Sequence, residues 1–257
     1  MSAAIDTPWK ITNRFFSLLV YPYVRLLFAM NNIPWGQDWR FYGIPIIQKH
    51  RKSSISFGPG LQLRSSVRSN PLGPDHPVML VTWEEGAILE VGKNFAMSGG
   101  VLCAGNRITI GNNVVVGANT IFVDTDFHPL DSEMRRLNPA NAQPSPVVIE
   151  DNVFIGMTCM ILKGVTIGTC SVIGAGSLVT HSVPPYTIAA GNPARPVRDL
   201  TAQFRNKPPL DLDNRINQPV NILQEGKMSD ILTAATIPGR NPMPTPSTPN
   251  GVMVGKN

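Results

Sequence analysis

The chain has 257 residues, of which 42% are hydrophobic and 15% are charged, and its formal net charge is +5. The hydrophobic content is enough for one main domain with appended segments, and the basic balance favours an anionic partner, such as a nucleic acid, a membrane surface or a phosphorylated cofactor. The 22 glycines and 24 prolines indicate many tight turns. The three cysteines have no CxxC spacing, which predicts reduced, cytosolic thiols. Basic residues are dispersed without an aromatic and basic module, so no nucleic-acid partner is expected.

Residues 1–54 are predicted to form an apolar, helical N-terminal segment. Its most apolar run, Phe15 to Met30, is interrupted by Pro22 and Arg25 and is too short and broken for a membrane span. No small-residue cleavage site follows it, so a secretory signal peptide is not indicated. Two interpretations stay open: one or two short helices docked on the domain, or an interfacial membrane anchor through residues 15–30. The aromatic residues of such an anchor would be Trp9, Tyr21, Tyr23 and Trp35.

A six-residue rhythm begins faintly at Ile55 and is interrupted by a turn-rich excursion at residues 69–86. It returns at Val91, slips by one residue after Cys103 and resumes at Ile110. A single extra residue can be absorbed as a bulge at a corner of a coil. The rhythm therefore predicts about five circuits of a repeating coil.

The rhythm is strict from Ile149 to Pro184. An aliphatic residue opens every block of six, and the fifth position of each block is small or β-branched. A spacing of six returns at about 240° on a helix, so this pattern cannot cover one helical face. Recurring glycines also exclude one unbroken strand. The sequence thus predicts an all-β coil of short strands, three blocks per circuit, with rungs about 4.8 Å apart. The opening aliphatic residues are Ile149, Ile155, Ile161, Ile167, Ile173 and Val179.

Two further segments leave the coil. Residues 124–147 contain the sequence DTDFHPLD and then a polar stretch, and loops that project from a rigid scaffold often carry chemistry. Residues 199–257 have no periodicity and many prolines, which predicts an irregular, flexible tail. The predicted domain of coils accordingly spans residues 55–198.

The strict repeat, the FHPLD sequence around His128 and the AAGNPARPVR sequence at residues 189–198 together resemble the hexapeptide-repeat acyltransferases. Within that family the chain looks like the sugar and polysaccharide O-acetyltransferases related to maltose and galactoside acetyltransferases. The resemblance implies a left-handed parallel β-helix, a homotrimer with active sites between subunits, and acetyl-CoA as co-substrate. It implies acetyl transfer to a hydroxyl of a sugar or a surface-polysaccharide precursor. The cysteine pattern favours the cytoplasm, and an interfacial N-terminal anchor would hold the protein at the inner face of the membrane.

The family's catalytic histidine corresponds by motif to His128. An imidazole can take the proton of an alcohol as that alcohol attacks a thioester carbonyl, and this supports a general-base role. The residues that could orient the imidazole are Asp124, Asp126 and Asp131, and the sequence does not choose among them.

The resemblance places coenzyme A along the C-terminal circuits. Backbone groups at Met157, Ala175 and Thr180 would line its pantetheine arm, and Phe154 stands where relatives often have tryptophan. Arginines in and after the GNPA sequence could bind its phosphates. These are Arg195 and Arg198, with Lys163 and His181 as weaker candidates.

The predicted acceptor residues are Ser98 and Asn106, at positions where sugar acetyltransferases often present Asn and Asp. Both side chains can hydrogen-bond a hydroxyl, but the substitution argues against a simple galactoside or maltose as acceptor. The apolar N-terminal segment instead suggests an acceptor carried on a lipid or a growing polysaccharide.

Two other classes of protein are alternatives to the acetyltransferase. A carbonic anhydrase on the same coil needs three histidine ligands for zinc, and the four histidines show no ligand spacing, so no metal is expected. A catalytically inactive scaffold that uses its C-terminal tail to bind partners is the alternative.

Overall fold

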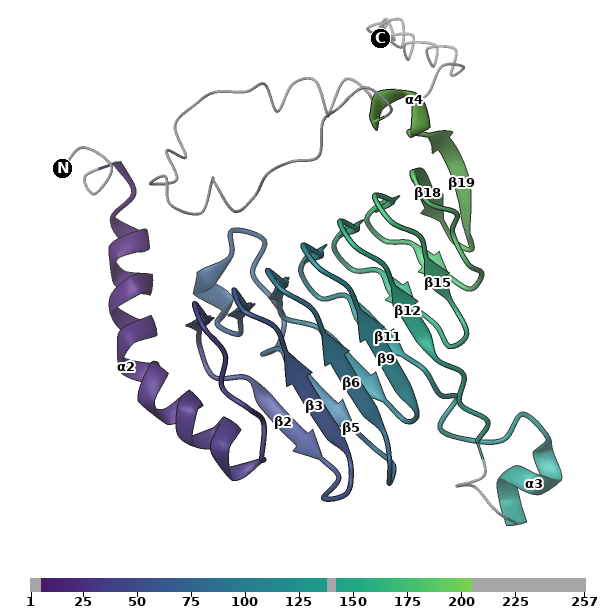
Figure 1. Cartoon of the computed structure of the whole chain (residues 1–257), viewed down its shortest axis with the longest axis horizontal. Coiled ribbons are helices and arrows are strands. Elements are labelled where there is room, and N and C mark those ends of the chain that lie inside the picture. Colours follow the sequence, from purple (N-terminus) through teal and green to yellow (C-terminus); the bar gives the residue numbers. More distant parts are fainter. Residues whose placement is uncertain (1–5, 138–141, 205–257) are drawn as a thin grey trace, which may run out of the picture. The chain divides into compact units, whose positions relative to one another are not determined.

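The computed structural model describes residues 6–137 and 142–204, and Figure 1 shows their arrangement. The predicted tail of residues 199–257 falls outside this part of the chain from residue 205 onward. Short strands follow one another around three sheets, so that each strand from β1 to β14 pairs with the strand three places further along the chain, and β16 pairs with β18. All of these pairings are parallel except the closing β18–β19 hairpin, which is antiparallel.

The three sheets are called sheets A, B and C. Sheet A contains β1 (Arg40–Tyr42), β4 (Gln62–Arg64), β7 (Ala96–Ser98), β10 (Val115–Val116), β13 (Phe154–Ile155), β16 (Val172–Ile173), β18 (Thr187–Gly191) and β19 (Ala194–Asp199). Sheet B contains β2 (Ile46–Lys49), β5 (Met79–Thr82), β8 (Val101–Ala104), β11 (Ile121–Val123), β14 (Met160–Ile161) and β17 (Leu178–Val179). Sheet C contains β3 (Ser54–Phe57), β6 (Ile88–Val91), β9 (Arg107–Ile110), β12 (Val147–Ile149) and β15 (Thr166–Ile167).

The aliphatic residue of each block stacks on its equivalent in the next circuit. Ile155 pairs with Ile173 in sheet A, Ile161 with Val179 in sheet B, and Ile149 lies beside Ile167 in sheet C. Each of these side chains is at most 1% exposed. The periodicity therefore predicted the interior of the parallel β-helix correctly, because every circuit buries the residue that occupies the same place in the repeat.

The fifth position of each block is also buried. Where this position is a serine, its hydroxyl is satisfied by the turn: Ser171 Oγ donates to the carbonyl of Pro184 at 2.8 Å, and Ser177 Oγ donates to that of Gly174 at 2.6 Å. Cys159 fills the same place and is 2% exposed.

An asparagine ladder holds the corner between sheets C and A. Asn94, Asn113 and Asn152 have φ values of 57°, 57° and 60°, in the left-handed region that asparagine tolerates better than most residues. The amide of Asn94 donates to Asn113 Oδ1 at 2.9 Å, and that of Asn113 donates to Asn152 Oδ1 at 3.0 Å. The ladder links successive circuits through their side chains as well as their backbones.

The parallel ladder begins earlier than the predicted boundary at residue 55. Strands β1 and β2, which lie inside the predicted helical segment of residues 1–54, pair with β4 and β5. Strand β5 in turn lies inside the predicted excursion of residues 69–86. This first circuit lacks the regular six-residue register, so its strands are defined by pairing with the circuit above and not by a local pattern.

Helix α2 (Pro8–Met30) packs against the first circuit of the coil (Figure 1). Val24 and Phe28 are completely buried, and the Phe28 ring lies 5.5 Å from that of Trp39 and 5.4 Å from that of Phe41. The helix thus covers apolar groups that no preceding circuit covers. It docks on the domain, as one of the two open interpretations expected, but as a single helix of 23 residues and not as short helices. No helix in residues 6–137 and 142–204 combines the length and apolar character needed to span a bilayer.

Two insertions interrupt the coils. The first follows β4 and contains the short 3-10 helix η1 (Val67–Ser69), and the second follows β11 and carries α3 (Ser132–Leu137). Figure 1 shows α3 projecting away from the stacked strands. After the β18–β19 hairpin, the described chain ends in α4 (Thr201–Phe204).

Candidate functional site

The predicted site residues lie along two different corners of the β-helix. Corner BC, where the chain passes from sheet B to sheet C, includes the turns after β8, β11, β14 and β17. Corner AB, where it passes from sheet A to sheet B, includes the turns after β7, β13 and β16. Corner BC carries Asn106, His128, Lys163 and Thr180, whereas corner AB carries Ser98, Met157 and Ala175. Sheet B separates the two corners within one chain.

His128 is exposed on the loop that follows β11 at corner BC. The loop is anchored next to the histidine, because Lys163 in the following circuit forms an ion pair with Asp126. The same ammonium group donates to the carbonyl of Gln143 at 2.8 Å, at the returning end of the loop. Lys163, one of the weaker candidates for binding the phosphates of coenzyme A, therefore holds both ends of the loop that carries His128.

The carboxylate of Asp124 is completely buried beneath this loop. It accepts backbone N–H groups from Gly105 at 2.6 Å, Asn106 at 2.8 Å and Arg107 at 2.6 Å. Burial raises the pKa of Asp124, and the backbone donors partly offset that shift. Asp124 thus fixes the turn after β8 against the base of the His128 loop, a structural role that was not among those predicted for it.

Asp131 immediately precedes helix α3. Its Oδ1 accepts the backbone N–H of Met134 at 2.7 Å, which is a typical helix-capping contact. The guanidinium of Arg135 closes the same turn by donating to the carbonyls of Pro129 at 3.0 Å and Leu130 at 2.7 Å. The three candidate aspartates therefore have distinct contacts: a buried turn for Asp124, the Lys163 ion pair for Asp126, and the helix cap for Asp131.

Further along corner BC, Thr180 and His181 follow β17. The Thr180 hydroxyl and His181 Nδ1 lie 2.8 Å apart. Lys163 and Thr180 occupy successive circuits above the His128 loop, so the corner forms a continuous line of polar groups.

Corner AB is built on close approach between circuits. A Cβ on Gly117 would lie 2.4 Å from the backbone nitrogen of Met157, and one on Gly156 would lie 2.5 Å from that of Ala175. Glycine is therefore required at positions 117 and 156 for the circuits that carry Met157 and Ala175 to stack this closely. Ser98, lower on this corner, has its hydroxyl 2.9 Å from the amide nitrogen of Asn70, which comes from the first insertion.

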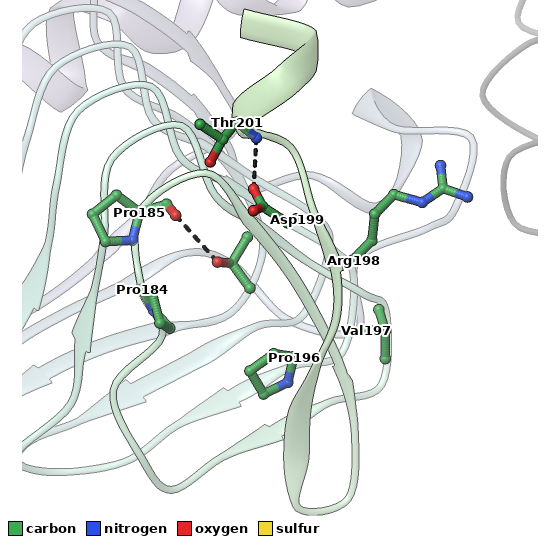
Figure 2. A pocket seen from close by; sticks show the side chains of 8 residues that line it. Pro184, Pro185, Pro196, Val197, Arg198, Asp199 and Thr201 are labelled. Carbon is green, nitrogen blue, oxygen red and sulfur yellow. Dashed lines mark hydrogen bonds between the residues drawn. The ribbon is translucent and has the colours of Figure 1, made fainter. Parts of the chain in front are cut away.

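The predicted phosphate ligands lie on β19, at the C-terminal end of the coil. A hollow of about 420 Å³ beside β19 is lined by Pro184, Pro185, Thr187, Pro196, Val197, Arg198, Asp199 and Thr201. Figure 2 shows the Arg198 side chain extending away from Pro184 and Pro185, and Asp199 accepting the backbone N–H of Thr201, a contact of 2.7 Å. Arg195 is also exposed on β19, and Phe154 is 47% exposed on sheet A.

The sequence interpretation missed a second cavity, of about 260 Å³, at corner BC. The Trp83 and Phe127 rings lie edge to face there, with ring centroids 6.3 Å apart. Phe127 immediately precedes His128, which was a local signal. Trp83 lies in the predicted excursion and could not be placed at this corner before β5 was known to belong to the coil. The lining residues are Trp83, Glu84, Gly105, Thr125, Phe127, Ala142 and Pro144.

The buried thiols of Cys103 and Cys159 are held in their protonated form. Burial, with a smaller contribution from the nearby Asp124 carboxylate, raises the pKa of Cys103 to about 11. Burial also raises the pKa of Cys159. Neither thiol is suited to act as a nucleophile at neutral pH. Within residues 6–137 and 142–204, no group of three or more His, Cys, Asp and Glu side chains is arranged to hold a metal ion.

Comparison with known proteins identifies the repeat. A family model described as bacterial transferase hexapeptide (six repeats) matches residues 146–181. Galactoside O-acetyltransferase of Escherichia coli is 37% identical over 120 residues, which are 47% of this chain and 58% of that protein. The 2,3,4,5-tetrahydropyridine-2,6-dicarboxylate N-acetyltransferase of Brevibacillus brevis is 42% identical over 71 residues, which are 28% of this chain and 29% of that protein.

A solved structure supports the fold at lower identity. An N-acyltransferase from Bacillus cereus, in complex with dTDP and coenzyme A, aligns with a TM-score of 0.51 at 17% identity, covering 72% of this chain and 89% of that one. At that identity the likeness supports the fold alone. The architecture is that of a hexapeptide-repeat, left-handed parallel β-helix.

The predicted resemblance to the hexapeptide-repeat acyltransferase family is confirmed by the repeat match and by the E. coli relative. The chain spans less than two thirds of the length of both curated relatives.

Proposed function

We propose that this protein is a coenzyme A-dependent O-acetyltransferase that moves an acetyl group from acetyl-CoA to a hydroxyl of a sugar or a surface-polysaccharide precursor. The observation that carries the proposal is the loop at corner BC that carries His128 and that Lys163 holds at both ends. It projects from a repeat whose sequence relatives include a galactoside O-acetyltransferase. Asn106, Lys163 and Thr180 share that corner.

In the proposed reaction, His128 is the general base. Acetyl-CoA supplies an acyl thioester when it is bound. The imidazole takes the proton of the acceptor hydroxyl as the hydroxyl oxygen attacks the thioester carbonyl, and it returns that proton to the departing thiolate. Such a base contributes about 10²–10⁴-fold to the rate. No covalent acyl-enzyme is needed, in keeping with the protonated state of Cys103 and Cys159.

The groups available for coenzyme A fit its chemistry in part. Arg195 and Arg198 are exposed guanidinium groups at the C-terminal end of the coil, where they can bind phosphates. Met157, Ala175 and Thr180 present backbone groups along the two corners for an amide-containing arm, and Phe154 offers an exposed aromatic face. Lys163 is already paired with Asp126 in the His128 loop, so it is the weakest of these candidates for binding coenzyme A.

We further propose that the active sites form between chains of a homotrimer. Within one chain, sheet B separates Ser98, Met157 and Ala175 on corner AB from His128 on corner BC. A second copy that docks its corner AB against corner BC would bring both sets to one cleft, and a closed ring of such contacts gives a cyclic oligomer.

Helix α2 supports a peripheral contact with an anionic membrane. Its outer face exposes large apolar side chains, it carries Lys10, Arg14 and Arg25, and it contains no acidic residue. This combination is typical of a helix that lies in the plane of the lipid headgroups. The protein would then act at the inner face of the membrane on a lipid-linked acceptor. The exposed apolar residues of α2 are Trp9, Ile11, Phe15, Phe16, Leu18, Leu19, Tyr23, Leu26 and Met30.

The test of the proposed function is acceptor-dependent release of free thiol from acetyl-CoA. The acceptor panel contains monosaccharides, nucleotide sugars, oligosaccharides and an amino sugar, the last because the B. brevis relative is an N-acetyltransferase. His128→Ala is expected to reduce the rate by at least about 10²-fold because it removes the base. Its melting temperature should stay unchanged because the exposed loop side chain contributes little to the core.

His50→Ala is the matched control. His50 lies at the first turn of the same corner and its Nδ1 accepts the backbone N–H of Lys52, so its loss should leave the transfer rate unchanged. Full activity of His128→Ala would exclude the general-base role. If the wild-type chain transfers no acetyl group to any acceptor, the inactive scaffold that recruits partners through residues 199–257 becomes the better description.

A further inference from the structure

Helix α2 closes the N-terminal end of the coil and does not lie along one of its sides. The Phe28 ring packs on Phe41 and Trp39, whose side chains are buried in the interior of the first circuit. The Ser17 hydroxyl donates to the carbonyl of Phe41, on the free edge of sheet A, where β1 is the terminal strand. Figure 1 shows α2 at one end of the stacked circuits and β18 and β19 at the other. The outer face of α2 therefore points along the coil axis, away from the circuits.

Positive charge is concentrated at the same end of the molecule. Residues 6–57, which comprise α2 and the first circuit, contain seven Lys and Arg and two acidic residues, a net charge of +5. One of these cations, Lys52, forms an ion pair with Glu85 of the second circuit. Residues 58–204 contain nine Lys and Arg and eleven acidic residues, a net charge of −2. Charge is thus separated along the coil axis, and an anionic surface would attract the α2 end and orient the molecule.

The basic residues of α2 flank its exposed apolar face. On a helix with 3.6 residues per turn, Lys10, Arg14 and Arg25 fall within about 60° of one another, on the flank of the helix nearest the coil. All three are exposed. A bilayer that receives the outer face of α2 would meet these cations at the level of its headgroups, where long basic side chains extend.

The insertion after β4 adds to this surface. The Asn13 side-chain amide donates to the carbonyl of Arg68 at 3.0 Å, so η1 lies beside the N-terminal half of α2. Arg68 is exposed, and its neighbour Val67 is 62% exposed. The second insertion element therefore brings a further cation and a further apolar side chain next to the helix.

The charge of this end selects among its partners. Two copies of the chain that met through α2 would bring two layers of net positive charge together, which is unfavourable. A row of exposed apolar side chains that is flanked by cations is complementary to a bilayer with anionic headgroups.

The number of circuits sets the height of the proposed base above α2. His128 follows β11, which is the third strand beyond β2 in sheet B. Parallel strands lie about 4.8 Å apart, so β11 is about 14 Å further along the coil axis than β2. A helix with its side chains is about 10 Å across, which places His128 about 24 Å from the outer face of α2. Burial of that face by about 5–10 Å leaves about 14–19 Å between His128 and the membrane surface.

We propose that α2 holds the coil upright on an anionic membrane, with the coil axis along the bilayer normal, and that the acceptor is a sugar separated from its lipid by several further sugar units. A sugar attached directly to the lipid lies among the headgroups and cannot reach His128. In the proposed homotrimer, three parallel coils would place three α2 helices on the same membrane, and this three-point contact would fix the tilt. The inference rests on the proposed function and deepens it by naming the orientation and the class of acceptor.

A pair of labelled positions on the outer face of sheet C measures the orientation. Ser56 on β3 and Thr166 on β15 lie in one column, four strand spacings apart, so an upright coil separates their heights by about 19 Å. A fluorophore is attached to full-length Ser56→Cys or Thr166→Cys, each combined with Cys170→Ser because Cys103 and Cys159 are buried. Energy transfer is measured to a headgroup dye in vesicles of phosphatidylcholine and phosphatidylserine in equal parts. It should be clearly stronger from position 56 than from position 166.

The contribution of charge is measured with the same vesicles. Arg14→Gln is expected to weaken vesicle binding about fivefold, since one basic side chain near an anionic surface contributes about that much. Lys93→Gln is the matched control, because it removes one exposed cation from the turn after β6, away from α2. It should leave vesicle binding unchanged, and vesicles of phosphatidylcholine alone should bind the wild type more weakly.

The class of acceptor is tested with one sugar in three forms. The sugar that the acceptor panel identifies is supplied as a free methyl glycoside, as a glycolipid with the sugar directly on the lipid, and as a glycolipid with the sugar at the end of an oligosaccharide. On vesicles, the third form should be acetylated at least about tenfold faster than the second, because only the third can reach His128. The free glycoside should be acetylated with or without vesicles.

Equal energy transfer from positions 56 and 166 would overturn the upright orientation, as would vesicle binding that Arg14→Gln does not weaken. Equal rates on the two glycolipids would overturn the class of acceptor. A chain that acetylates the free glycoside but binds no vesicle would refute this inference and leave the proposed function intact. An upright chain that transfers no acetyl group to any of the three forms would refute the proposed function.

Discussion

Asp124 is a buried carboxylate that supports the base of the loop carrying His128 through its contacts with backbone N–H groups. Its two oxygens accept three backbone N–H groups from the turn after β8, and this turn also lines the cavity beside Trp83 and Phe127. The side chain therefore connects the stability of the coil to the shape of the site. A buried group of this kind is costly to alter because each donor it leaves unpaired loses both protein and water as partners.

Asp124→Asn is expected to lower the free energy of unfolding by about 1–3 kcal/mol at neutral pH, since the amide offers one acceptor oxygen in place of two. Burial raises the pKa of the native carboxyl, so the folded chain binds its proton more tightly than the unfolded chain does. The wild-type stability attributable to this group is therefore fully present below the unfolded pKa, about 3.9, and falls as the pH rises towards the folded value.

Urea denaturation of both chains between pH 4 and pH 8 measures this effect. The difference in free energy of unfolding between wild type and Asp124→Asn should narrow with increasing pH. A difference that widens with pH would show that the backbone donors outweigh burial and that the native pKa is lowered.

Helix α2 has two apolar faces, of which one is buried and the other is exposed. One face places Val24 and Phe28 against the first circuit, where an end of the coil would otherwise expose its interior. The other face leaves Phe15, Leu18 and Leu19 in solvent. Since the helix packs through only one face, stability and membrane contact can be separated by mutation.

Leu18→Asp combined with Leu19→Asp should abolish cosedimentation with vesicles that contain anionic lipid, because it places charge on the face proposed to enter the headgroups. Its melting temperature should remain close to that of the wild type. Phe28→Ala is the matched change on the buried face and should cost about 3–5 kcal/mol of stability. Vesicle binding that survives the double aspartate variant, or that also occurs with purely neutral vesicles at the same strength, would argue against an anionic membrane as the partner.

At the scale of the whole molecule, the coil distributes its polar groups along separate corners. The three-sheet prism is rigid because each circuit buries an aliphatic stack, so corners AB and BC cannot approach each other within one chain. A site that uses both corners must therefore combine corner AB of one copy with corner BC of another copy.

Complementation between two inactive variants tests that arrangement. His128→Ala damages corner BC, and Ala175→Trp obstructs corner AB where adjacent circuits approach closely. If the sites form between chains, co-expression in equal amounts should restore activity in about a quarter of them, since some pairs then contribute two intact corners. Sites contained within one chain would recover no activity. The mass of the assembly in solution, measured by sedimentation, should correspond to three chains.

The six-residue repeat by itself predicted which side chains form the interior of this protein. Ile149, Ile155 and Ile161 are buried because a repeat places equivalent residues above one another, and this periodicity is visible locally. The same register indicated that residues 124–147 leave the coil and present His128. The resemblance in the FHPLD and GNPA sequences supplied the expected chemistry.

Only the tertiary structure showed that the coil begins at Arg40, that Lys163 fastens the loop through Asp126, and that Trp83 and Phe127 enclose a cavity. In each case the deciding contact joins residues from different circuits or from an irregular segment, where no period relates one position to the other. Position within the repeat fixes which side chains point inward. Which polar and aromatic groups meet on the outside depends on insertions, and these take their conformation from the circuits on which they pack.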